Sequence, residues 1–254
     1  MDNYLKSNYH THTTRCKHAV GEDRAYVEAA IAAGITELGF SDHIPMPTTD
    51  KRVNSIRMLF SEVDDYMDSL LSLKREYRKD ITIKVGFEGE YFAPVFQEQM
   101  ELLQQYPYDY LILGQHFIEV DGKGGYSGYE SKDKRWLTTY VDTCIEALET
   151  GKYRYLCHPD LIRFTGEEAF WEKEMRRLCV YCKEHGYPLE YNLLGALEQR
   201  HYPSHRFFAL AGEVGNDIIL GIDAHAPEQI GKKEPYQQAL DVIDRYHLTV
   251  IDAI

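Results

Sequence analysis

The sequence predicts an α/β fold, a distorted TIM-like barrel of seven βα units with its polar site at the carboxyl ends of the strands. Short runs of strand character alternate with longer amphipathic runs, which is the pattern of βα units in a parallel sheet. Histidines and acidic residues follow six of the strand-like runs within a few residues. Barrel enzymes build their sites from many βα loops in this way, whereas an open doubly wound sheet concentrates its ligand at one switch point.

Seven runs of strand character are the expected strands. In chain order they are 7–9, 37–40, 82–87, 110–113, 153–157, 188–191 and 217–222. A shorter run at 249–251 is expected to close or edge the sheet.

Seven amphipathic runs are the expected helices. Several start at Ser, Asp or Pro and have a Gly near the end, which are helix-boundary signals. They are 23–33, 61–78, 94–105, 133–149, 167–185, 204–214 and 236–246. Cys179 and Cys182 fall inside the fifth run, where a three-residue spacing places them on one helix face, so a redox or zinc role for the pair is not expected.

Length and composition indicate one domain, spanning residues 1–254, because this length is ordinary for an α/β barrel and no linker interrupts it. The formal net charge of −13 disfavours a nucleic-acid partner, which requires clustered basic residues. The first residues lack the apolar core of a signal peptide, and no later stretch reaches membrane-spanning length. Five cysteines are an odd number without a disulfide-scaffold spacing, which suits a reducing compartment. We therefore expect a cytoplasmic protein that binds neither nucleic acid nor membranes, in an oligomeric state that the sequence leaves open.

Nine histidines and carboxylates occupy the predicted strand ends. They are His10, His12, His18, His43, Glu88, His116, His158, Asp223 and His225. Imidazoles and carboxylates gathered from many strands are ligands for several borderline divalent ions rather than for one structural zinc. Any one of these histidines could instead be a hydrogen-bonded loop residue, but seven of the eleven histidines lie at strand ends, which independent placement would not produce. The sequence therefore predicts a multinuclear metal centre.

Glu88 is the expected bridging ligand, because its two oxygens can bind two ions that lie about 3.5–4 Å apart. Glu90 would face the same side of an extended chain and is the alternative. The four histidines outside the strand ends are expected to have ordinary surface or helix-end roles. They are His185, His201, His205 and His247.

These motifs, in this order, resemble the polymerase-and-histidinol-phosphatase (PHP) superfamily. The matching pieces are His10-x-His12, His18, Ser41-Asp42-His43, Gly86-Phe87-Glu88, His116, His158-Pro159 and Asp223-x-His225, and they cover nearly the whole chain. The opening motif, with Cys16-x-His18-Ala19, and the segment 39–45 are most similar to the monofunctional histidinol-phosphate phosphatases.

The resemblance implies a distorted barrel of seven βα units with three divalent ions, which the ligand chemistry allows to be zinc, manganese or iron. By position it implies that His10, His12, Glu88 and Asp223 hold the first ion, that Glu88, His116 and His158 hold the second, and that His18, His43 and His225 hold the third.

The resemblance also implies a metal-dependent phosphomonoesterase that hydrolyses L-histidinol phosphate in histidine biosynthesis. A hydroxide bridging two ions would attack phosphorus while the third ion binds a phosphoryl oxygen, so Glu88 and Asp223 would act in catalysis through the ions that they hold. No Gly-x-Ser-x-Gly motif and no Gly-rich phosphate loop ending in Lys-Ser or Lys-Thr is present in the sequence.

Arg163 and Arg200 are the expected phosphate-binding residues, because each follows a strand-like run and a guanidinium donates two parallel hydrogen bonds. The resemblance supports the same two residues, and a surface salt bridge is the alternative for each. Arg15 is a third candidate, although the short loop between His12 and His18 constrains it.

The amine and imidazole of histidinol phosphate would suit a pocket with acidic and aromatic walls, for which Phe117, Glu119 and Tyr191 are candidates. Two other interpretations stay open. One is another PHP phosphoesterase that acts on nucleotides, other small phosphate esters or phosphotyrosine. The other is a non-catalytic PHP module, which would require degraded ligands that this chain does not show.

Overall fold

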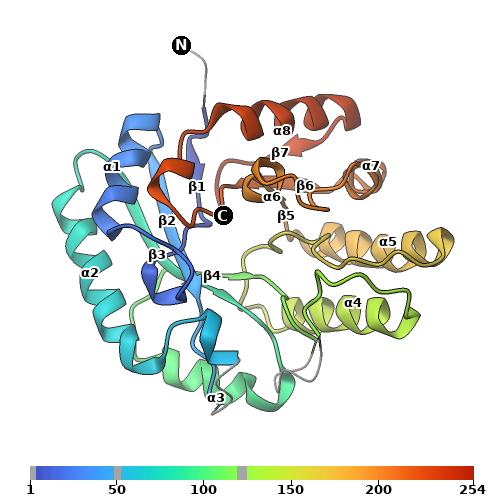
Figure 1. Ribbon diagram of the computed structural model, residues 1–254, viewed down its shortest axis with the longest axis horizontal. Coiled ribbons are helices and arrows are strands. Elements are labelled where there is room, and N and C mark those ends of the chain that lie inside the picture. Colours follow the sequence, from blue (N-terminus) through green and yellow to red (C-terminus); the bar gives the residue numbers. More distant parts are fainter. Residues whose placement is uncertain (1–3, 49–52, 119–124) are drawn as a thin grey trace. The chain divides into compact units, whose positions relative to one another are not determined.

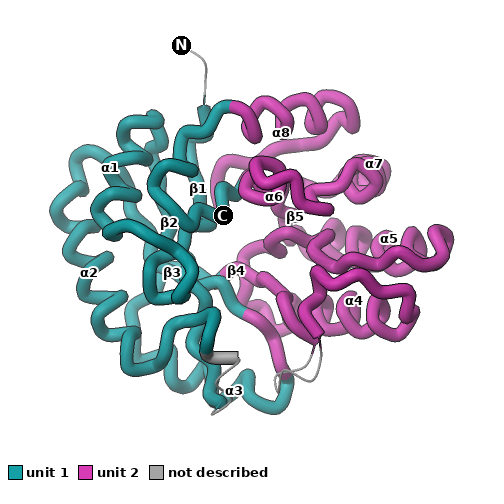
Figure 2. Tube along the Cα trace, in the orientation of Figure 1, with its two compact units in different colours: residues 1–89, 93–111, 221–233 teal, residues 90–92, 112–220, 234–254 magenta. Residues whose placement is uncertain are grey.

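The computed structural model describes residues 4–48, 53–118 and 125–254, in which helices alternate with strands (Figure 1). Contacts within the chain group these residues into two compact units, each built from several chain segments (Figure 2). Unit 1 comprises Met1–Gly89, Ala93–Leu111 and Gly221–Lys233. Unit 2 comprises Glu90–Phe92, Ile112–Leu220 and Glu234–Ile254.

Unit 1 contains a sheet whose strand order follows the sequence. The strands are β1 (Ser7–Asn8), β2 (Glu37–His43), β3 (Thr82–Gly89) and the first half of β4 (Tyr110–Leu113). The helices are α1 (Asp23–Ala33), α2 (Val63–Glu76) and α3 (Ala93–Leu103), with short 3-10 helices η1 (Thr14–Cys16), η2 (Val53–Ile56), η3 (Phe60–Glu62) and η4 (Pro227–Gln229). α2 packs on β3 and on α1.

The strands of unit 1 are parallel where β1 meets β2 and where β2 meets β3, and their register aligns the polar ends. His43, the last residue of β2, lies opposite Glu88 of β3. Gly39 and Gly86 leave room for the ring of Tyr110, whose hydroxyl donates to the carbonyls of Tyr9 (2.8 Å) and Phe40 (3.1 Å). A side chain at either glycine would collide with this ring, so the two glycines set how closely the strands and β4 approach.

The returning segment 221–233 pairs with the residues that follow β1. Thr11 forms a parallel bridge with Ala224, and the His12 N–H donates to the Ala224 carbonyl at 2.8 Å. The Ile222 N–H donates to Oδ1 of the buried Asn8 at 2.8 Å. This pairing brings the end of the chain's last major strand beside its first.

Unit 2 contains the second sheet, of strand order β5–β6–β7. Its elements are α4 (Lys134–Glu149), α5 (Glu168–His185), β5 (Leu189–Asn192), α6 (Leu193–Leu197), α7 (His205–Val214), most of β6 (Asp217–Gly221), nearly all of α8 (Lys233–Tyr246) and β7 (Thr249–Val250). The Asp133 and Ser204 side chains cap α4 and α7 by accepting backbone N–H groups, as the boundary signals predicted.

The strand predicted at 153–157 is wrong. Leu156 alone forms isolated parallel bridges, with Leu113 on one side and Leu189 on the other. The extended stretch ends at once because His158 adopts a left-handed backbone conformation, with φ of 27°. The sequence also gave no signal for α6, a single short turn that begins at the Asn192 cap.

The predicted helices are confirmed with small shifts at their ends. α1 has the predicted bounds, the run 61–78 divides into η3 and α2, and α8 starts three residues before the predicted 236. Cys179 and Cys182 are fully buried on α5, and burial raises the pKa of both thiols, as expected for core residues. No helix among the described residues is both long and apolar enough to span a membrane.

Candidate metal centre

Two fully buried imidazoles follow β1 in unit 1. His10 and His12 lie two residues apart on extended chain, which turns both side chains to the same side, and their ring centroids are 5.2 Å apart. The pairing of Thr11 with Ala224 fixes this stretch from the other side. The first candidate ligands are therefore held by backbone on both flanks.

Asp223 and Glu88 bring carboxylates to these rings. Oδ1 of Asp223 lies 3.3 Å from Nε2 of His10 and 3.0 Å from Nε2 of His12. Oε2 of Glu88 lies 3.6 Å from both of those nitrogens and 2.8 Å from Nδ1 of His43. One oxygen of Glu88 thus lies near histidines of two segments, the stretch after β1 and the end of β2.

Asp223 sits in a left-handed backbone conformation, with φ of 57°. This conformation costs a non-glycine residue about 1–2 kcal/mol. Strain of this kind persists only where the surroundings fix it and is common at functional sites. Here the flanking hydrogen bonds of Ile222 and Ala224 hold it.

A second group in unit 1 contains only imidazoles. One ring nitrogen each of His18, His43 and His225 lies within 4.8 Å of the other two. Nδ1 of His18 contacts the Cys16 carbonyl at 2.8 Å, and Nδ1 of His225 contacts the Asp223 carbonyl at 2.9 Å. These contacts favour the tautomer that leaves Nε2 as a lone-pair donor toward an ion, which is the usual arrangement of metal-binding histidines.

His12 shows that the group suits a cation. It is fully buried, and neither ring nitrogen has a hydrogen-bond partner, although carboxylate oxygens lie 3.0 Å and 3.5 Å away. A buried polar atom without a partner costs about 1–3 kcal/mol, which a bound ion would relieve. The donor set of imidazole nitrogens and carboxylate oxygens therefore fits divalent metal ions.

The charges of this group are strongly coupled. Although burial opposes it, the carboxylates of Asp223 and Asp42 raise the pKa of His12 well above its ordinary value. Although burial opposes this too, His10 and His12 hold the pKa of Asp223 well below its usual range. Burial and the charge of His12 lower the pKa of His225 to about 3, so this ring is neutral and ready to bind a metal.

Asp42 is a functional candidate that the sequence motif contained without assigning it a role. Its buried carboxylate accepts the N–H of Thr13 (3.2 Å) and of His43 (2.7 Å), and a short hydrogen bond from the Thr13 hydroxyl. Oδ1 also lies 3.5 Å from Nδ1 of His12. Asp42 therefore lies beside the His12 ring and ties the loop after β1 to β2.

Two further predicted ligands lie in unit 2. The rings of His116 and His158 have centroids 4.9 Å apart. Oε1 of Glu90 accepts the backbone N–H of His116 (3.0 Å) and of Phe117 (2.9 Å). Glu90 thus holds the backbone beside His116 in unit 2, whereas Glu88 lies among the imidazoles of unit 1.

The loops that carry Arg163 and Arg200 are joined inside unit 2. Oδ2 of the buried Asp160 accepts the Ser204 N–H at 2.6 Å, and Nε2 of His201 lies 2.8 Å from the Leu161 carbonyl. Burial raises the pKa of Asp160 to about 6. Burial, and then the charges of Arg163, Arg200 and Arg206, lower the pKa of His201. His201 is exposed, as the sequence suggested, and it also contacts the Leu161 carbonyl.

The arginines themselves have acidic partners. Arg163 lies 3.4 Å from Glu130 with 45 % of its side chain exposed, and Arg200 bonds Glu198 and the Tyr202 hydroxyl (2.6 Å). Arg15 bonds Asp23 and Asp65, which occupies its guanidinium.

Phe117 and Tyr191, the two aromatic residues predicted from the sequence as pocket walls, lie in unit 2. Tyr191 and Arg200 line one cavity of about 360 Å³. Phe117 packs on Tyr126, with ring centroids 5.9 Å apart. Glu119 lies outside the described residues.

Comparisons with known proteins agree with this chemistry. The model of the PHP domain family matches residues 8–193. The chain is 27 % identical over 229 residues to a probable histidinol-phosphatase of Deinococcus radiodurans, with 87 % of each chain covered. It is 30 % identical over 157 residues to the histidinol-phosphatase of Bacillus subtilis, covering 59 % of this chain and 58 % of that one.

Among solved structures, the chain is similar to the histidinol phosphate phosphatase of Lactococcus lactis in complex with zinc, L-histidinol and phosphate. The TM-score is 0.74 at 20 % identity, with 98 % of this chain and 96 % of that chain covered. Metal-dependent tyrosine phosphatases of Bacillus subtilis and Streptococcus pneumoniae are more distant, with a TM-score of 0.52 at 13 % identity and 96 % of each chain covered. This likeness confirms the fold class that the sequence predicted.

Proposed function

The chain belongs to the PHP domain family, and from that premise we propose that it is a metal-dependent phosphatase that hydrolyses L-histidinol phosphate to L-histidinol and phosphate. One observation carries the proposal. Glu88 and Asp223 bring carboxylate oxygens to within 3.6 Å of ring nitrogens of His10 and His12, and fully buried His12 has no hydrogen-bond partner. A hydrolase that polarises a phosphate ester with divalent ions requires such a donor set.

We assign the metal ligands as follows. His10, His12, Glu88 and Asp223 hold one ion, and His18, His43 and His225 hold another. His116 and His158 are proposed ligands of a third on the strength of their motifs and of their ring contact. Zinc, manganese and iron all suit this chemistry.

Bound divalent ions would lower the pKa of an attacking water and neutralise charge on the phosphoryl oxygens. The chain's own residues prepare the site for this. The Asp42 carboxylate lies beside His12, and the carbonyls of Cys16 and Asp223 orient His18 and His225 through Nδ1. Burial of His10, His12 and Glu88 keeps bulk water from the ligand atoms, which strengthens each charge interaction.

Arg163 and Arg200 are proposed to bind the phosphate oxygens. The Ser204 N–H donates to the Asp160 carboxylate, and Nε2 of His201 contacts the Leu161 carbonyl, so the loops that carry the two arginines are joined. Each guanidinium forms an exposed ion pair, Arg163 with Glu130 and Arg200 with Glu198. Exposed pairs contribute little stability, so a dianionic ester would displace them. Tyr191, which shares a cavity with Arg200, is a proposed wall for the remainder of the substrate.

The test of the function compares kcat/KM on histidinol phosphate, nucleotide monophosphates, phosphotyrosine and p-nitrophenyl phosphate with metal-saturated enzyme. Histidinol phosphate should be best by a wide margin, because a site that pairs its amine and imidazole leaves polar groups unsatisfied around a generic ester. p-Nitrophenyl phosphate has the better leaving group. If it is hydrolysed faster than histidinol phosphate, the enzyme is a different PHP phosphoesterase.

We further propose that residues 1–254 act as one domain, because each compact unit is assembled from three separated segments and neither is a continuous stretch of chain. The cytoplasm is the proposed compartment, since the five cysteines are buried and form no disulfide with one another in the described part of the chain.

A further inference from the structure

A buried carboxylate in unit 2 lies behind one of the proposed metal ligands. Glu190, on β5, is fully buried, although acidic side chains rarely are unless they are paired. Its Oε2 accepts the backbone N–H of His158 at 3.0 Å and a side-chain N–H of Asn192, also at 3.0 Å. One carboxylate oxygen therefore joins the segment of His158 to the start of α6.

The backbone at His158 requires such a support. Its φ of 27° lies in the left-handed region, which a residue with a side chain rarely adopts. A conformation of this kind persists only where the surroundings fix it. The Glu190 carboxylate holds the N–H of this residue, and the His158 carbonyl accepts the Leu161 N–H at 2.9 Å. Both peptide groups that flank the side chain of His158 are therefore held from within unit 2.

Main-chain pairing places Glu190 at this position. Leu156 forms a parallel bridge with Leu189, and the Glu190 N–H donates to the Leu156 carbonyl at 2.9 Å. The chain after Leu156 and the chain after Leu189 therefore run side by side. This arrangement sets the side chain of Glu190 beside His158, where the extended stretch ends.

The second hydrogen bond of Glu190 leads toward Arg200. Asn192 donates to Glu190 through Nδ2 and accepts the Gly195 N–H through Oδ1 at 2.8 Å, which caps α6. The Gly195 carbonyl in turn accepts the Arg200 N–H at 2.9 Å. A continuous series of hydrogen bonds thus runs within unit 2 from the backbone of His158 to the backbone of Arg200.

We propose that Glu190 is a positioning residue, which sets His158 for metal binding and, through Asn192, sets Arg200 for binding a phosphate oxygen. The roles of His158 and Arg200 in this proposal rest on the function proposed above. A carboxylate suits the position, because each of its oxygens can accept more than one hydrogen bond. Loss of a residue that supports a metal ligand typically weakens metal binding by about 10–100-fold.

The affinity of the whole chain for Zn²⁺, measured by competition with a chromophoric chelator, tests the role at His158. Glu190→Met has a similar length but no acceptor and should weaken one binding step by about 10-fold or more. Glu190→Asp, which withdraws the oxygens by one methylene, should show a loss in the same step and decides the matter if the Met variant does not fold. Glu190→Gln should restore most of the affinity, because its amide oxygen can accept both N–H groups.

Glu174→Met is the matched control, because Glu174 is another buried carboxylate of unit 2 but pairs with Arg177 on α5. Its Zn²⁺ affinity should equal that of the wild type. Wild-type affinity in both Glu190→Met and Glu190→Asp, or the same loss in Glu174→Met, overturns the proposal.

His158→Ala identifies the affected ion. This variant should lose one binding step, and adding a Glu190 substitution that folds should weaken Zn²⁺ binding no further, because the carboxylate acts only through His158. An additional loss in the double variant would show that Glu190 supports the fold in general and would overturn the proposal. Unchanged Zn²⁺ binding in His158→Ala would overturn it as well.

Asn192→Ser tests the link to Arg200. A serine can still cap α6, but it has no side-chain amide to reach Glu190. The affinity for Zn²⁺ should stay at the wild-type value, whereas inorganic phosphate should bind the zinc-saturated variant several-fold more weakly in calorimetry. Unchanged phosphate binding overturns the link. Neither readout involves histidinol phosphate, so an enzyme that hydrolyses a different ester would refute the proposed function and leave the role of Glu190 standing.

Discussion

Nε2 of His12 lies 3.0 Å from Oδ1 of Asp223, although more than 200 residues separate the two in sequence. The backbone pairing of Thr11 with Ala224 brings them together. The same pairing places His10 3.3 Å from Asp223. Main-chain hydrogen bonds between distant segments therefore hold the backbone of the first candidate metal ligands. The spacing of these ligands does not depend on loop side chains.

Glu88→Gln should reduce turnover by more than about 100-fold and should remove more than one bound metal ion. The reason is that one Glu88 oxygen lies near both the His10–His12 pair and His43. Metal analysis of the untreated variant together with kcat checks this. Glu90→Gln is the matched control, since Glu90 holds backbone near His116. If Glu90→Gln loses the same ions and Glu88→Gln keeps them, the bridging role belongs to Glu90.

Arg163→Ala and Arg200→Ala should fold and retain metal but lose about 1.5–3 kcal/mol of transition-state binding each, the value of a hydrogen bond to a charged group. Lys at either position should restore only part of the lost transition-state binding, because an ammonium cannot reproduce the two parallel hydrogen bonds of a guanidinium. The measurements are kcat/KM and thermal stability. Unchanged kinetics would make that arginine a surface ion pair with Glu130 or Glu198 and nothing more.

His201→Ala should raise KM several-fold and leave metal content unchanged, because the Nε2 contact with the Leu161 carbonyl aligns the two arginine loops. His201→Gln, which can still donate to that carbonyl, should recover most of the affinity. His185→Ala is the control, since the His185 ring stacks on Tyr181 and contacts its carbonyl at the end of α5. Equal effects of Ala at 201 and 185 would dismiss the positioning role.

Metal binding should stabilise the protein more strongly as pH rises from about 6 to 8. Asp223 and Asp42 raise the pKa of His12, so an ion that binds this ring must displace a proton and protons compete with metal. In metal-free protein, by contrast, the stability should fall as pH rises. The raised pKa of His12 contributes stability that is present below its unfolded value near 6.5 and is lost as pH rises through the folded value. Melting temperatures with chelator and with Zn²⁺ across this range test it, and a metal-induced shift independent of pH would contradict it.

Thermal or denaturant unfolding of the metal-loaded protein should show one cooperative transition. Each compact unit is assembled from segments on both sides of the other in sequence, so neither can be released intact by a single cut. Circular dichroism and tryptophan fluorescence should give coincident midpoints. Two separated transitions would show that the units unfold independently and would refute the single-domain proposal.

The alternation of strand and helix patterns and the acidic or imidazole residues at strand ends were readable from the sequence, because side-chain periodicity and turn residues are local properties. Among the described residues, six of the seven predicted main strands and all seven predicted helices are present, and the predicted histidines and carboxylates of unit 1 lie together. The run 153–157 was predicted as a strand because of its composition. In the structure the left-handed backbone at His158 ends the extended stretch, and only Leu156 forms bridges.

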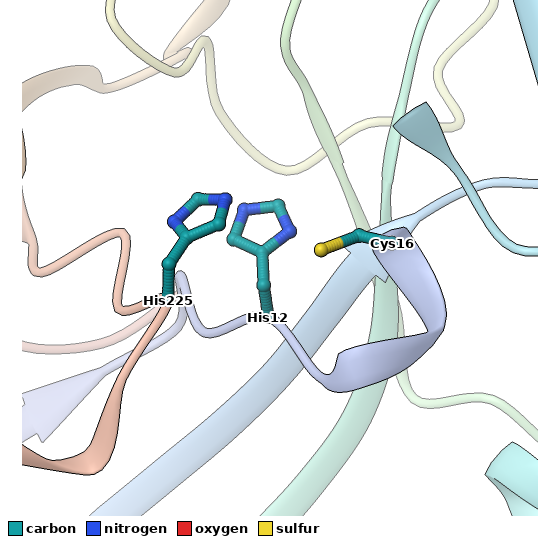
Figure 3. A group of neighbouring side chains, drawn as sticks. All are labelled: His12, Cys16 and His225. Atoms are coloured by element: carbon teal, nitrogen blue, oxygen red, sulfur yellow. The ribbon is translucent and has the colours of Figure 1, made fainter. Parts of the chain in front are cut away.

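Only the tertiary structure decided which groups meet. Glu88 and Glu90 are equivalent by spacing, yet Glu88 lies 2.8 Å from Nδ1 of His43 and Glu90 accepts the His116 N–H. Three other contacts could not be predicted from the sequence pattern. Asp42 and Cys16 lie beside His12, as Figure 3 shows for Cys16, and His201 contacts Leu161. Each depends on the relative position of segments distant in sequence, which sheet register and main-chain pairing set, whereas periodicity records only the face on which a residue lies.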